Sequence, residues 1–386
     1  MQDVSLMHIN PMKTLLFLLL CIEICFAQKP NFVAQTIDNQ ISIGYGLAIG
    51  DVDGDKKPDI LMADQKQFVW YRNGDWKRFV MAENLTERDN VCIAARDIDG
   101  DGKVEVAVGA NWNPSETNDP KKSGSVHYLI RPKDPTQKWE AIELHHEVTI
   151  HRMKWVKVNK TNYQLVVVPL HGLGNKNGEG NGVKIWAYDI PKNPKAEWKR
   201  NLVDSTMHLT HNFEIKEESS GKTYLTIGGK EGLRTYHYTN RWEKDSSEVK
   251  NMQIGEVKHV EISKNSYFAT VQPMHGNKLV IVSEKQAPNT LTENLNQGHA
   301  LVVDDFLKLG FPQIAVGWRE PNQDKKVGIK FYIFDLNGSQ WKEFTIDNNT
   351  LACEDMQFAD LDGDGRSEII ASGRATKNLV IYWNRE

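Results

Sequence analysis

The sequence predicts an all-β fold, a seven-bladed β-propeller whose ring is closed by the N-terminal strand. Three observations support this prediction: seven related segments follow one another along the chain, each is accompanied by further strand-like runs, and helical periodicity is hardly visible. Repeats of four strands at a period of roughly 45 to 60 residues are typical of propeller blades.

The three best-preserved segments begin at Leu47, Ile93 and Met356. They read LAIGDVDGDKKPDILMAD, IAARDIDGDGKVEVAVGA and MQFADLDGDGRSEIIASG. Each combines a short apolar run, an acidic glycine-rich turn and a second apolar run, which is the pattern of a β-hairpin. These three segments therefore predict the first two strands of three blades.

Four weaker copies lie between the second and third of these segments. They read RMKWVKVNKTNYQLVVVPLHG, HNFEIKEESSGKTYLTIGG, VKHVEISKNSYFATVQPMHG and HALVVDDFLKLGFPQIAVGW. The two strand-like runs that follow a unit often include a tryptophan at the start of the second run, as in FVWYRNGDWKRFVMAE. The total is seven units of four strands.

The last unit lacks its fourth strand, because the chain ends at LVIYWNRE. Near the other end, NFVAQTID resembles the fourth-strand sequences KEFTIDNN and KRFVMAEN. We therefore expect the N-terminal strand to complete the last blade.

The N-terminal sequence MKTLLFLLLCIEICFAQ predicts a cleaved secretory signal, with a lysine, an apolar run over residues 15–27 and a small residue before Gln28. A membrane anchor is the alternative, but the apolar run is shorter than the ~20 residues of a spanning helix. We expect residues 1–27 to be an upstream start and signal peptide and residues 28–386 to be the propeller. The protein is then secreted or periplasmic, with no membrane span.

The composition is that of a soluble globular protein, with 40% hydrophobic and 25% charged residues and a formal net charge of -4. It provides no basic field, which argues against sequence-independent binding of nucleic acid. We expect a monomer. Removal of the signal leaves Cys92 and Cys353, which do not make a disulfide framework and whose pairing stays open.

The acidic turns place carboxylates at positions one, three, five and nine. These residues are Asp51, Asp53, Asp55 and Asp59, then Asp97, Asp99, Asp101 and Glu105, then Asp360, Asp362, Asp364 and Glu368. Carboxylates that alternate around a glycine turn converge on a hard cation, so a structural calcium ion is one interpretation. The other is that Asp and Gly satisfy the backbone of a tight turn.

The opposite face of the ring collects the starts of first strands and the ends of second strands. The first set is Tyr45, Cys92, His151, His211, Glu256, His299 and Glu354 beside Asp355; the second includes His171, His275, Trp112, Trp318, Arg319 and Arg374, with Arg234 opening a third strand. Histidines, arginines and carboxylates that converge on a concavity predict an active or ligand site.

Matching positions in different blades single out His151, His171 and His211 as functional histidines, with His208, His145 and His146 close by and His127 expected to be structural. Two or three of these imidazoles, His299 among them, would provide an open zinc site. Trp112 and Trp318 either stack on sugar rings or cap their blades. We expect no organic cofactor.

The stretches HRMKW with PLHG, and HLTHNF with EGLR, resemble secreted FG-GAP-type propellers from polysaccharide-degrading bacteria. The resemblance extends to ulvan oligosaccharide dehydratases, propeller ulvan lyases and the propeller part of aldos-2-ulose dehydratase. It implies an acidic oligosaccharide as substrate and a catalytic set of His151, His171, His211 and Arg234. The set expected to bind substrate is His208, His275, Arg319, Trp112, Trp318 and Glu354.

The implied reaction is β-elimination across C4 and C5 of a uronic acid. Arg234 or a metal would neutralise the substrate carboxylate, and histidines would act as base and acid because their pKa lies near working pH. The tyrosine of the lyases has no clear counterpart, which favours dehydration of a non-reducing-end uronate to the 4,5-unsaturated sugar. The alternatives are an endo-acting ulvan lyase and a non-catalytic propeller that binds a glycan or a protein.

Overall fold

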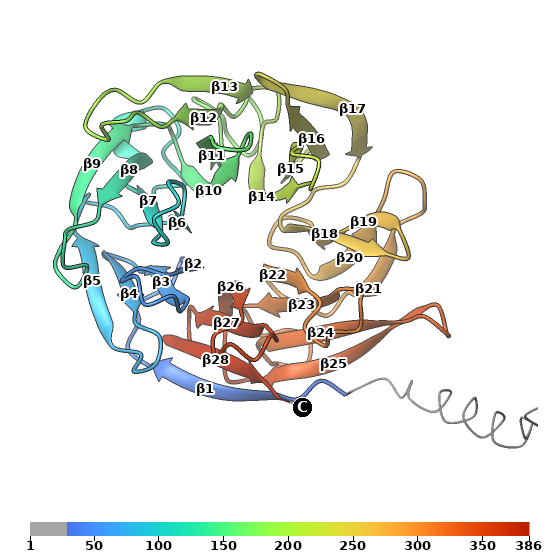
Figure 1. Cartoon of the computed structure of the whole chain (residues 1–386). Helices are drawn as coiled ribbons and strands as arrows, with labels where there is room; N and C mark the ends of the chain where they lie inside the picture. The colour runs from blue at the N-terminus through green and yellow to red at the C-terminus, as the bar shows by residue number, and fades with distance from the viewer. Residues whose placement is uncertain (1–28, 386) are drawn as a thin grey trace, which may run out of the picture.

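The computed structural model describes residues 29–385. Seven four-stranded antiparallel sheets stand around a central channel, as Figure 1 shows. The prediction of an all-β, seven-bladed β-propeller is confirmed. The predicted signal peptide lies outside the described residues, and among residues 29–385 no helix is long and apolar enough to cross a bilayer.

The first four blades follow the chain from the innermost to the outermost strand. Blade 1 is β2 (Gly46–Gly50), β3 (Asp59–Ala63), β4 (Gln67–Tyr71) and β5 (Arg78–Glu83). Blade 2 is β6 (Cys92–Arg96), β7 (Glu105–Ala110), β8 (Ser125–Ile130) and β9 (Glu140–His145), with a short 3-10 helix at Pro120–Lys122. Blade 3 is β10 (Ile150–Lys157), β11 (Tyr163–Pro169), β12 (Ile185–Asp189) and β13 (Arg200–Asp204). Blade 4 is β14 (Thr210–Glu217), β15 (Thr223–Gly229), β16 (Gly232–Tyr238) and β17 (Trp242–Lys250).

The remaining blades complete the circle. Blade 5 is β18 (Val257–Ile262), β19 (Asn265–Gln272), β20 (Lys278–Val282) and β21 (Asn289–Thr292). Blade 6 is β22 (Gly298–Asp304), β23 (Gln313–Trp318), β24 (Gly328–Asp335) and β25 (Gln340–Asn348). Blade 7 is β26 (Cys353–Ala359), β27 (Glu368–Gly373), β28 (Asn378–Asn384) and β1 (Phe32–Asp38).

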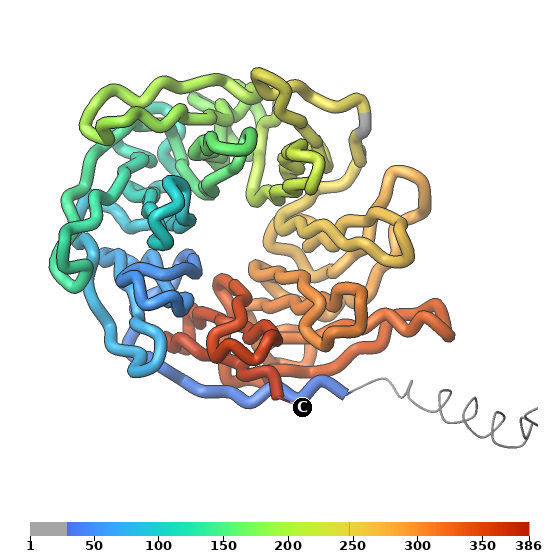
Figure 2. Tube along the Cα trace, viewed as in Figure 1, coloured from blue at the N-terminus to red at the C-terminus, as the bar shows by residue number. Residues whose placement is uncertain are grey.

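The ring is closed as the sequence predicts. β1 pairs antiparallel with β28, from Phe32 opposite Asn384 to Asp38 opposite Leu379. Figure 2 shows the two ends of the described chain side by side in this blade. In the closed ring, the innermost strands β26 and β2 of blades 7 and 1 also lie beside each other.

The core lies between neighbouring blades. A blade is covered on both faces, so its middle strands are apolar without alternation; every residue of β3 and of β7 is buried. Tryptophans at the start of outer strands lock adjacent loops, since Trp139 and Trp198 donate from Nε1 to the backbone oxygens of Pro135 and Pro194. This packing holds the inner strand ends that form the channel mouth.

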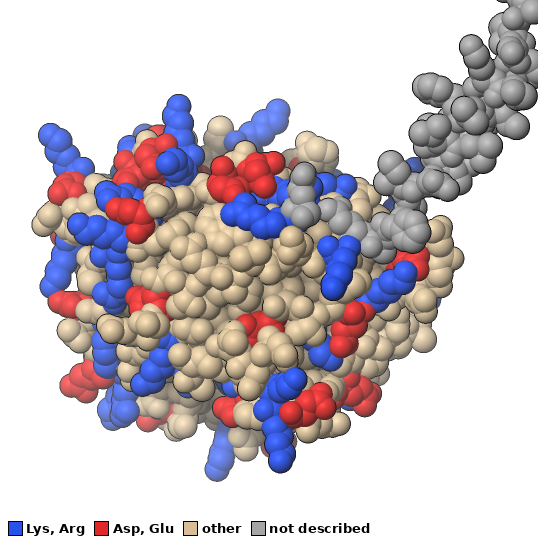
Figure 3. All heavy atoms as spheres, turned by 90° about the horizontal axis from the view of Figure 1, so that it is seen from below, with Lys and Arg blue, Asp and Glu red and all other residues tan. Residues whose placement is uncertain are grey.

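The outer side of the ring carries charges of both signs. Figure 3 shows Lys and Arg side chains interspersed with Asp and Glu, without a large area of one sign. This side therefore offers no basic stripe of the kind that nucleic-acid binding requires.

Candidate functional site

Beta-bulges lie at the start of the innermost strand in four blades. The register shifts between Ile150 and Arg152, Thr210 and Phe213, Gly298 and Ala300, and Cys353 and Asp355. The residues inside these shifts are His151, His211 with Asn212, His299 and Glu354. A bulge re-aims a side chain out of the regular alternation and is frequent next to active sites.

Three of these bulges, together with the segment after β19, bring four imidazoles together at one mouth of the channel. The ring of His211 lies at the centre, with its centroid 4.6 Å from that of His151, 4.6 Å from that of His275 and 5.3 Å from that of His299. The rings of His275 and His299 are 4.8 Å apart. His275 follows β19 with a φ of 54°, a backbone region that non-glycine residues rarely occupy and that is common at functional sites.

Fixed partners determine which nitrogen of each ring is available. Nδ1 of His151 donates to the backbone oxygen of His211 (3.0 Å), and Nδ1 of His299 donates to that of Glu354 (2.5 Å). Nδ1 of His211 lies 3.0 Å from Oε1 of Glu256. A neutral imidazole whose Nδ1 carries the proton keeps a lone pair on Nε2.

Burial keeps these imidazoles neutral. It holds the pKa of His151 and of His299 well below the ordinary imidazole value, and nearby cationic groups act in the same direction. Burial also lowers the pKa of His275, to about 2, with help from His211 and Arg319. Neutral imidazoles are competent both as bases and as metal ligands.

Two arginines held by one carboxylate lie next to the imidazoles. Glu354, 1% exposed, accepts from Arg319 at 2.8 Å and from Arg374 at 2.9 Å. Arg374 also lies over the ring of Tyr45, whose hydroxyl donates to Asp89. Since a guanidinium has five donors, both arginines retain donors for an anionic ligand.

Three of the imidazoles have the arrangement of a metal site. His211, His275 and His299 each offer a ring nitrogen, and these atoms lie within 4.8 Å of one another. Nε2 of His211 is 2.7 Å from Nε2 of His275. The contacts of the other ring nitrogens, with a carboxylate for His211 and a backbone oxygen for His299, are those that orient histidine ligands of metals. The donor set therefore fits zinc with an open coordination position.

The other two predicted catalytic residues, His171 and Arg234, contact residues of blades 3 and 4 and not the imidazole cluster. His171 forms a β-bridge with Leu209, and Nδ1 of His208 lies 2.8 Å from Glu231, so both histidines lie at the seam of blades 3 and 4. Arg234 on β16 donates a hydrogen bond to Thr206 and forms ion pairs with Asp204 and Glu248, which belong to the same two blades. Among the described residues, its partners include none of the four clustered imidazoles.

Of the remaining predicted aromatic and histidine residues, some lie near the imidazole cluster and others are buried in the blades. The ring of Trp112 lies 5.1 Å from that of His151, whereas Trp318 is 3% exposed and packs in the core between blades 5 and 6. Trp318 therefore caps its blade. His127 is buried in β8 and hydrogen-bonded to Ser125, as expected of a structural residue. His145, on the outer strand β9, is hydrogen-bonded to Tyr188 of β12 in the next blade.

Sequence reasoning missed Arg152 and Asn212 as residues of the site. Asn212 donates to Glu256, and Arg152 lines the channel just inside the imidazoles. Each residue directly follows a histidine that the repeat alignment had placed at the mouth, and this adjacency in the sequence was the available signal.

The acidic turns are built as tight turns. Asp97 accepts from the backbone nitrogens of Gly100 and Gly102, and Asp360 accepts in the same way from Gly363 and Gly365. The carboxylates also converge, in the groups Asp51, Asp53, Asp59; Asp97, Asp99, Asp101; and Asp360, Asp362, Glu368. Burial raises the pKa of Glu368 to about 7, and its Oε1 has no hydrogen-bond partner among the described residues. Asp55, Glu105 and Asp364 are outside these three groups.

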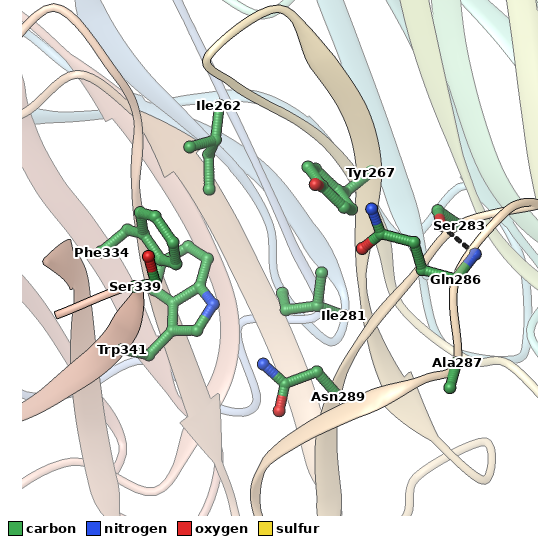
Figure 4. Close-up of a pocket in the computed structure, with 10 residues that line it drawn as sticks. All are labelled: Ile262, Tyr267, Ile281, Ser283, Gln286, Ala287, Asn289, Phe334, Ser339 and Trp341. Carbon is green, nitrogen blue, oxygen red and sulfur yellow. Dashed lines mark hydrogen bonds between the residues drawn. The ribbon is translucent and has the colours of Figure 1, made fainter. Parts of the chain in front are cut away.

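A pocket between blades 5 and 6, shown in Figure 4, has a different character. Its volume is about 210 Å³, and Tyr267, Phe334 and Trp341 form much of its wall. It contains none of the histidines, arginines or carboxylates that an elimination reaction uses. The channel mouth is therefore the better candidate for chemistry.

The architecture and the mouth define this protein as a seven-bladed propeller with a histidine-rich site. Family comparison adds that residues 31–108 match the FG-GAP-like repeat, and residues 123–285 match the β-propeller domain of aldos-2-ulose dehydratase. The predicted resemblance to both families is thus confirmed. The second match includes His151, His211 and His275.

Comparison with solved structures gives the fold. The chain is similar to BBS1N in a complex with ARL6DN soaked with mercury (12% identity, 92% of this chain and 96% of that one, TM-score 0.58). It is also similar to virginiamycin B lyase from Staphylococcus aureus (12% identity, 93% and 100%, TM-score 0.56) and to a chain of the Mitotic Checkpoint Complex (11% identity, 100% and 97%, TM-score 0.57). Among curated proteins no sequence matches. At these identities the likeness concerns the fold alone.

Proposed function

We propose that the protein is a carbon–oxygen lyase that dehydrates the non-reducing-end uronate of acidic, ulvan-type oligosaccharides. The observation that carries the proposal is the cluster of four neutral imidazoles beside Arg319 and Arg374. The match of residues 123–285 to a dehydratase propeller supports the reaction class.

The arginines provide carboxylate recognition in this proposal. A uronate carboxylate that accepts from Arg319 and Arg374 is neutralised, and this neutralisation makes the proton at C5 more acidic. Glu354 positions both guanidiniums and carries one negative charge for two positive ones. Arg234 was expected in this role, and its bonds to blades 3 and 4 favour the mouth arginines instead.

His151 is the proposed base. Its Nδ1–H is bonded to a backbone oxygen, so Nε2 has the lone pair, and its ring is outside the three-histidine group. Nε2 takes the proton from C5, the electron pair forms the C4–C5 double bond, and the C4–O bond breaks. The proton returns to the departing hydroxyl, which leaves as water.

The proposal includes a divalent metal, held by His211, His275 and His299. When bound, zinc would supply Lewis-acid stabilisation of the substrate carboxylate. Calcium is proposed separately for the acidic turns as a structural ion, where the unpartnered Oε1 of Glu368 supports it. We further propose that the enzyme acts outside the cytoplasm, as the N-terminal signal expected from the sequence implies. We propose that it is a monomer.

Product analysis tests the proposal. The protein is incubated with a defined oligosaccharide that has a non-reducing-end uronate, and absorbance of the unsaturated uronate is followed together with mass. A loss of one water without chain cleavage is expected. Cleavage of an internal bond would identify an endo-acting lyase, and binding without any unsaturated product would identify a non-catalytic propeller.

A further inference from the structure

The tryptophan at the start of the outer strand differs between blade 6 and blades 2, 3 and 4. In those three blades Trp139, Trp198 and Trp242 are at most 9% exposed. Each donates a hydrogen bond from Nε1 to an oxygen of the chain. Trp341 of blade 6 is only partly buried, and no described residue accepts a hydrogen bond from its Nε1. Its indole N–H is therefore a free donor.

The lengths of the neighbouring loops explain this difference. In blades 2 and 3, residues 131–139 and 190–199 fold back, so that the backbone oxygens of Pro135 and Pro194 reach the indoles. In blade 6, only residues 336–339 connect β24 to β25. Blade 5, on which Trp341 packs, has no tryptophan at the start of its outer strand, and β21 is the shortest described strand. The seam between blades 5 and 6 is therefore open at this place.

This opening is the pocket of about 210 Å³ in Figure 4, and its floor and walls are apolar. Phe334 and Trp341 stand on one side as an edge-to-face pair, with ring centroids 5.3 Å apart. Tyr267 stands on the other side, and Ile281 lies between them. The pocket therefore offers aromatic surface to a ligand on two sides.

Polar groups without partners surround the apolar surface. The side-chain amides of Gln286 and Asn289 and the hydroxyl of Tyr267 form no hydrogen bond with any described residue. The dashed line in Figure 4 joins Ser283 to the backbone nitrogen of Gln286, so the Gln286 amide stays available. None of the described residues that line the pocket is charged.

We propose that this pocket binds a neutral sugar ring of a glycan. The C–H face of a sugar ring packs on the indole or the phenol, and its hydroxyls both donate and accept, as the two amides do. An apolar ligand would leave the amides and the indole N–H unpaired, and a charged ligand would lose its hydration without gaining a counter-ion. A neutral polyhydroxylated ring satisfies both kinds of surface.

The site is separate from the mouth. Tyr267 lies near the turn between β18 and β19, on the face of the acidic turns, whereas His275 follows the other end of β19. The inference goes beyond the proposed function, because no residue of the mouth takes part in it.

An adjoining cavity gives room for a longer chain. Its volume is about 340 Å³, and it shares Tyr267, Ser283 and Gln286 with the first pocket. A second ring of the same glycan would therefore lie on the other side of Tyr267. This continuity favours an oligosaccharide over a single sugar.

Titration calorimetry with neutral trisaccharides of glucose, galactose, mannose, xylose and rhamnose tests the site. We expect at least one to bind the native protein with a Kd of about 1 mM or tighter. Trp341→Ala should weaken this binding at least tenfold, and Trp341→Phe, which keeps an aromatic face but no N–H, should have an intermediate affinity. Trp76→Ala is the matched control and should bind normally, since Trp76 is also only partly buried but packs on Trp383 outside the pocket.

Three results would overturn the proposal: no binding of any neutral trisaccharide, equal affinity in Trp341→Ala and the native protein, or binding of decaproline alone. Decaproline is included because aromatic grooves also bind polyproline helices. If Trp341→Ala does not fold, Asn289→Ala and Gln286→Ala change exposed side chains and should each weaken sugar binding.

Two further variants separate this pocket from the mouth. His211→Ala should bind the neutral trisaccharide with unchanged affinity, and Trp341→Ala should keep its turnover of a short uronate oligosaccharide. Loss of trisaccharide binding in His211→Ala would place the sugar at the mouth and overturn the proposal. Absence of unsaturated product would contradict the proposed function alone, since sugar binding is measured without turnover.

Discussion

Blades 1, 2 and 7 differ from blades 3, 4 and 6 at the two ends of the same hairpin. Blades 1, 2 and 7 have the acidic turn and no histidine at the mouth, whereas blades 3, 4 and 6 have lost that turn and begin with His151, His211 and His299. The second strand of the hairpin is largely apolar and buried in both groups. The two ends of a blade can therefore be changed independently, because the packed middle supports both.

Replacement of the central imidazole should have the largest effect. His211→Ala removes the ring that contacts His151, His275 and His299, and we expect the rate of unsaturated-product formation to fall by about 10²- to 10⁴-fold. His127→Asn is the control, since it alters a buried histidine of blade 2 away from the mouth. If His211→Ala and His127→Asn had equal activity, the histidines at the mouth would have no special role in the reaction.

Metal removal should be next in effect. We expect about one zinc per chain by elemental analysis, loss of turnover after chelation, and recovery when zinc is added back. His299→Ala should lower the zinc content, while Asp99→Asn in an acidic turn should leave it unchanged. Zinc retained in full by the His299 variant would contradict the three-histidine site.

Acid should destabilise the protein through buried histidines outside the mouth as well. Burial lowers the pKa of His127 to about 4, below the unfolded value near 6.5, so below pH 6.5 the unfolded chain binds a proton that the folded chain does not. The cost in folding free energy grows as pH falls and reaches about 2 kcal/mol at pH 5. Denaturant unfolding of His127→Asn at pH 5 and pH 7.5 should show this pH-dependent loss reduced.

The same experiment sharpens the comparison between the two kinds of buried histidine. If His127 behaves in this way, burial alone makes an imidazole neutral. Convergence of several rings, rather than neutrality, then distinguishes the mouth. An identical acid response in the variant and the native protein would exclude this role for His127.

Calcium should have the smallest effect. At a concentration several times its Kd, calcium should stabilise the fold by ~1 kcal/mol and raise Tm by a few degrees. Asp362→Asn, in the group that includes the unpartnered Oε1 of Glu368, should weaken the response without changing zinc content or turnover. If calcium leaves the Tm of the native protein unchanged, the acidic turns are tight turns only.

The sequence determined the fold of this protein almost completely. The repeats at Leu47, Ile93 and Met356 fixed the number of hairpins, and the incomplete last unit identified the N-terminal strand that pairs as β1 with β28. The repeat alignment also placed His151, His211 and His299 at one mouth. These features are local or periodic, and periodicity can be read along a single chain.

Only the tertiary structure decided which of these residues meet. Four β-bulges turn His151, His211, His299 and Glu354 out of strand alternation, and His275 joins them from the end of β19, while His171 and Arg234 go to the seam of blades 3 and 4. The buried Nη2 of Arg152, which has no hydrogen-bond partner among the described residues, was equally invisible in the sequence. A bulge adds one residue to one strand opposite a regular partner, so it depends on pairing between strands and on the neighbouring blades, and a repeat alignment contains neither.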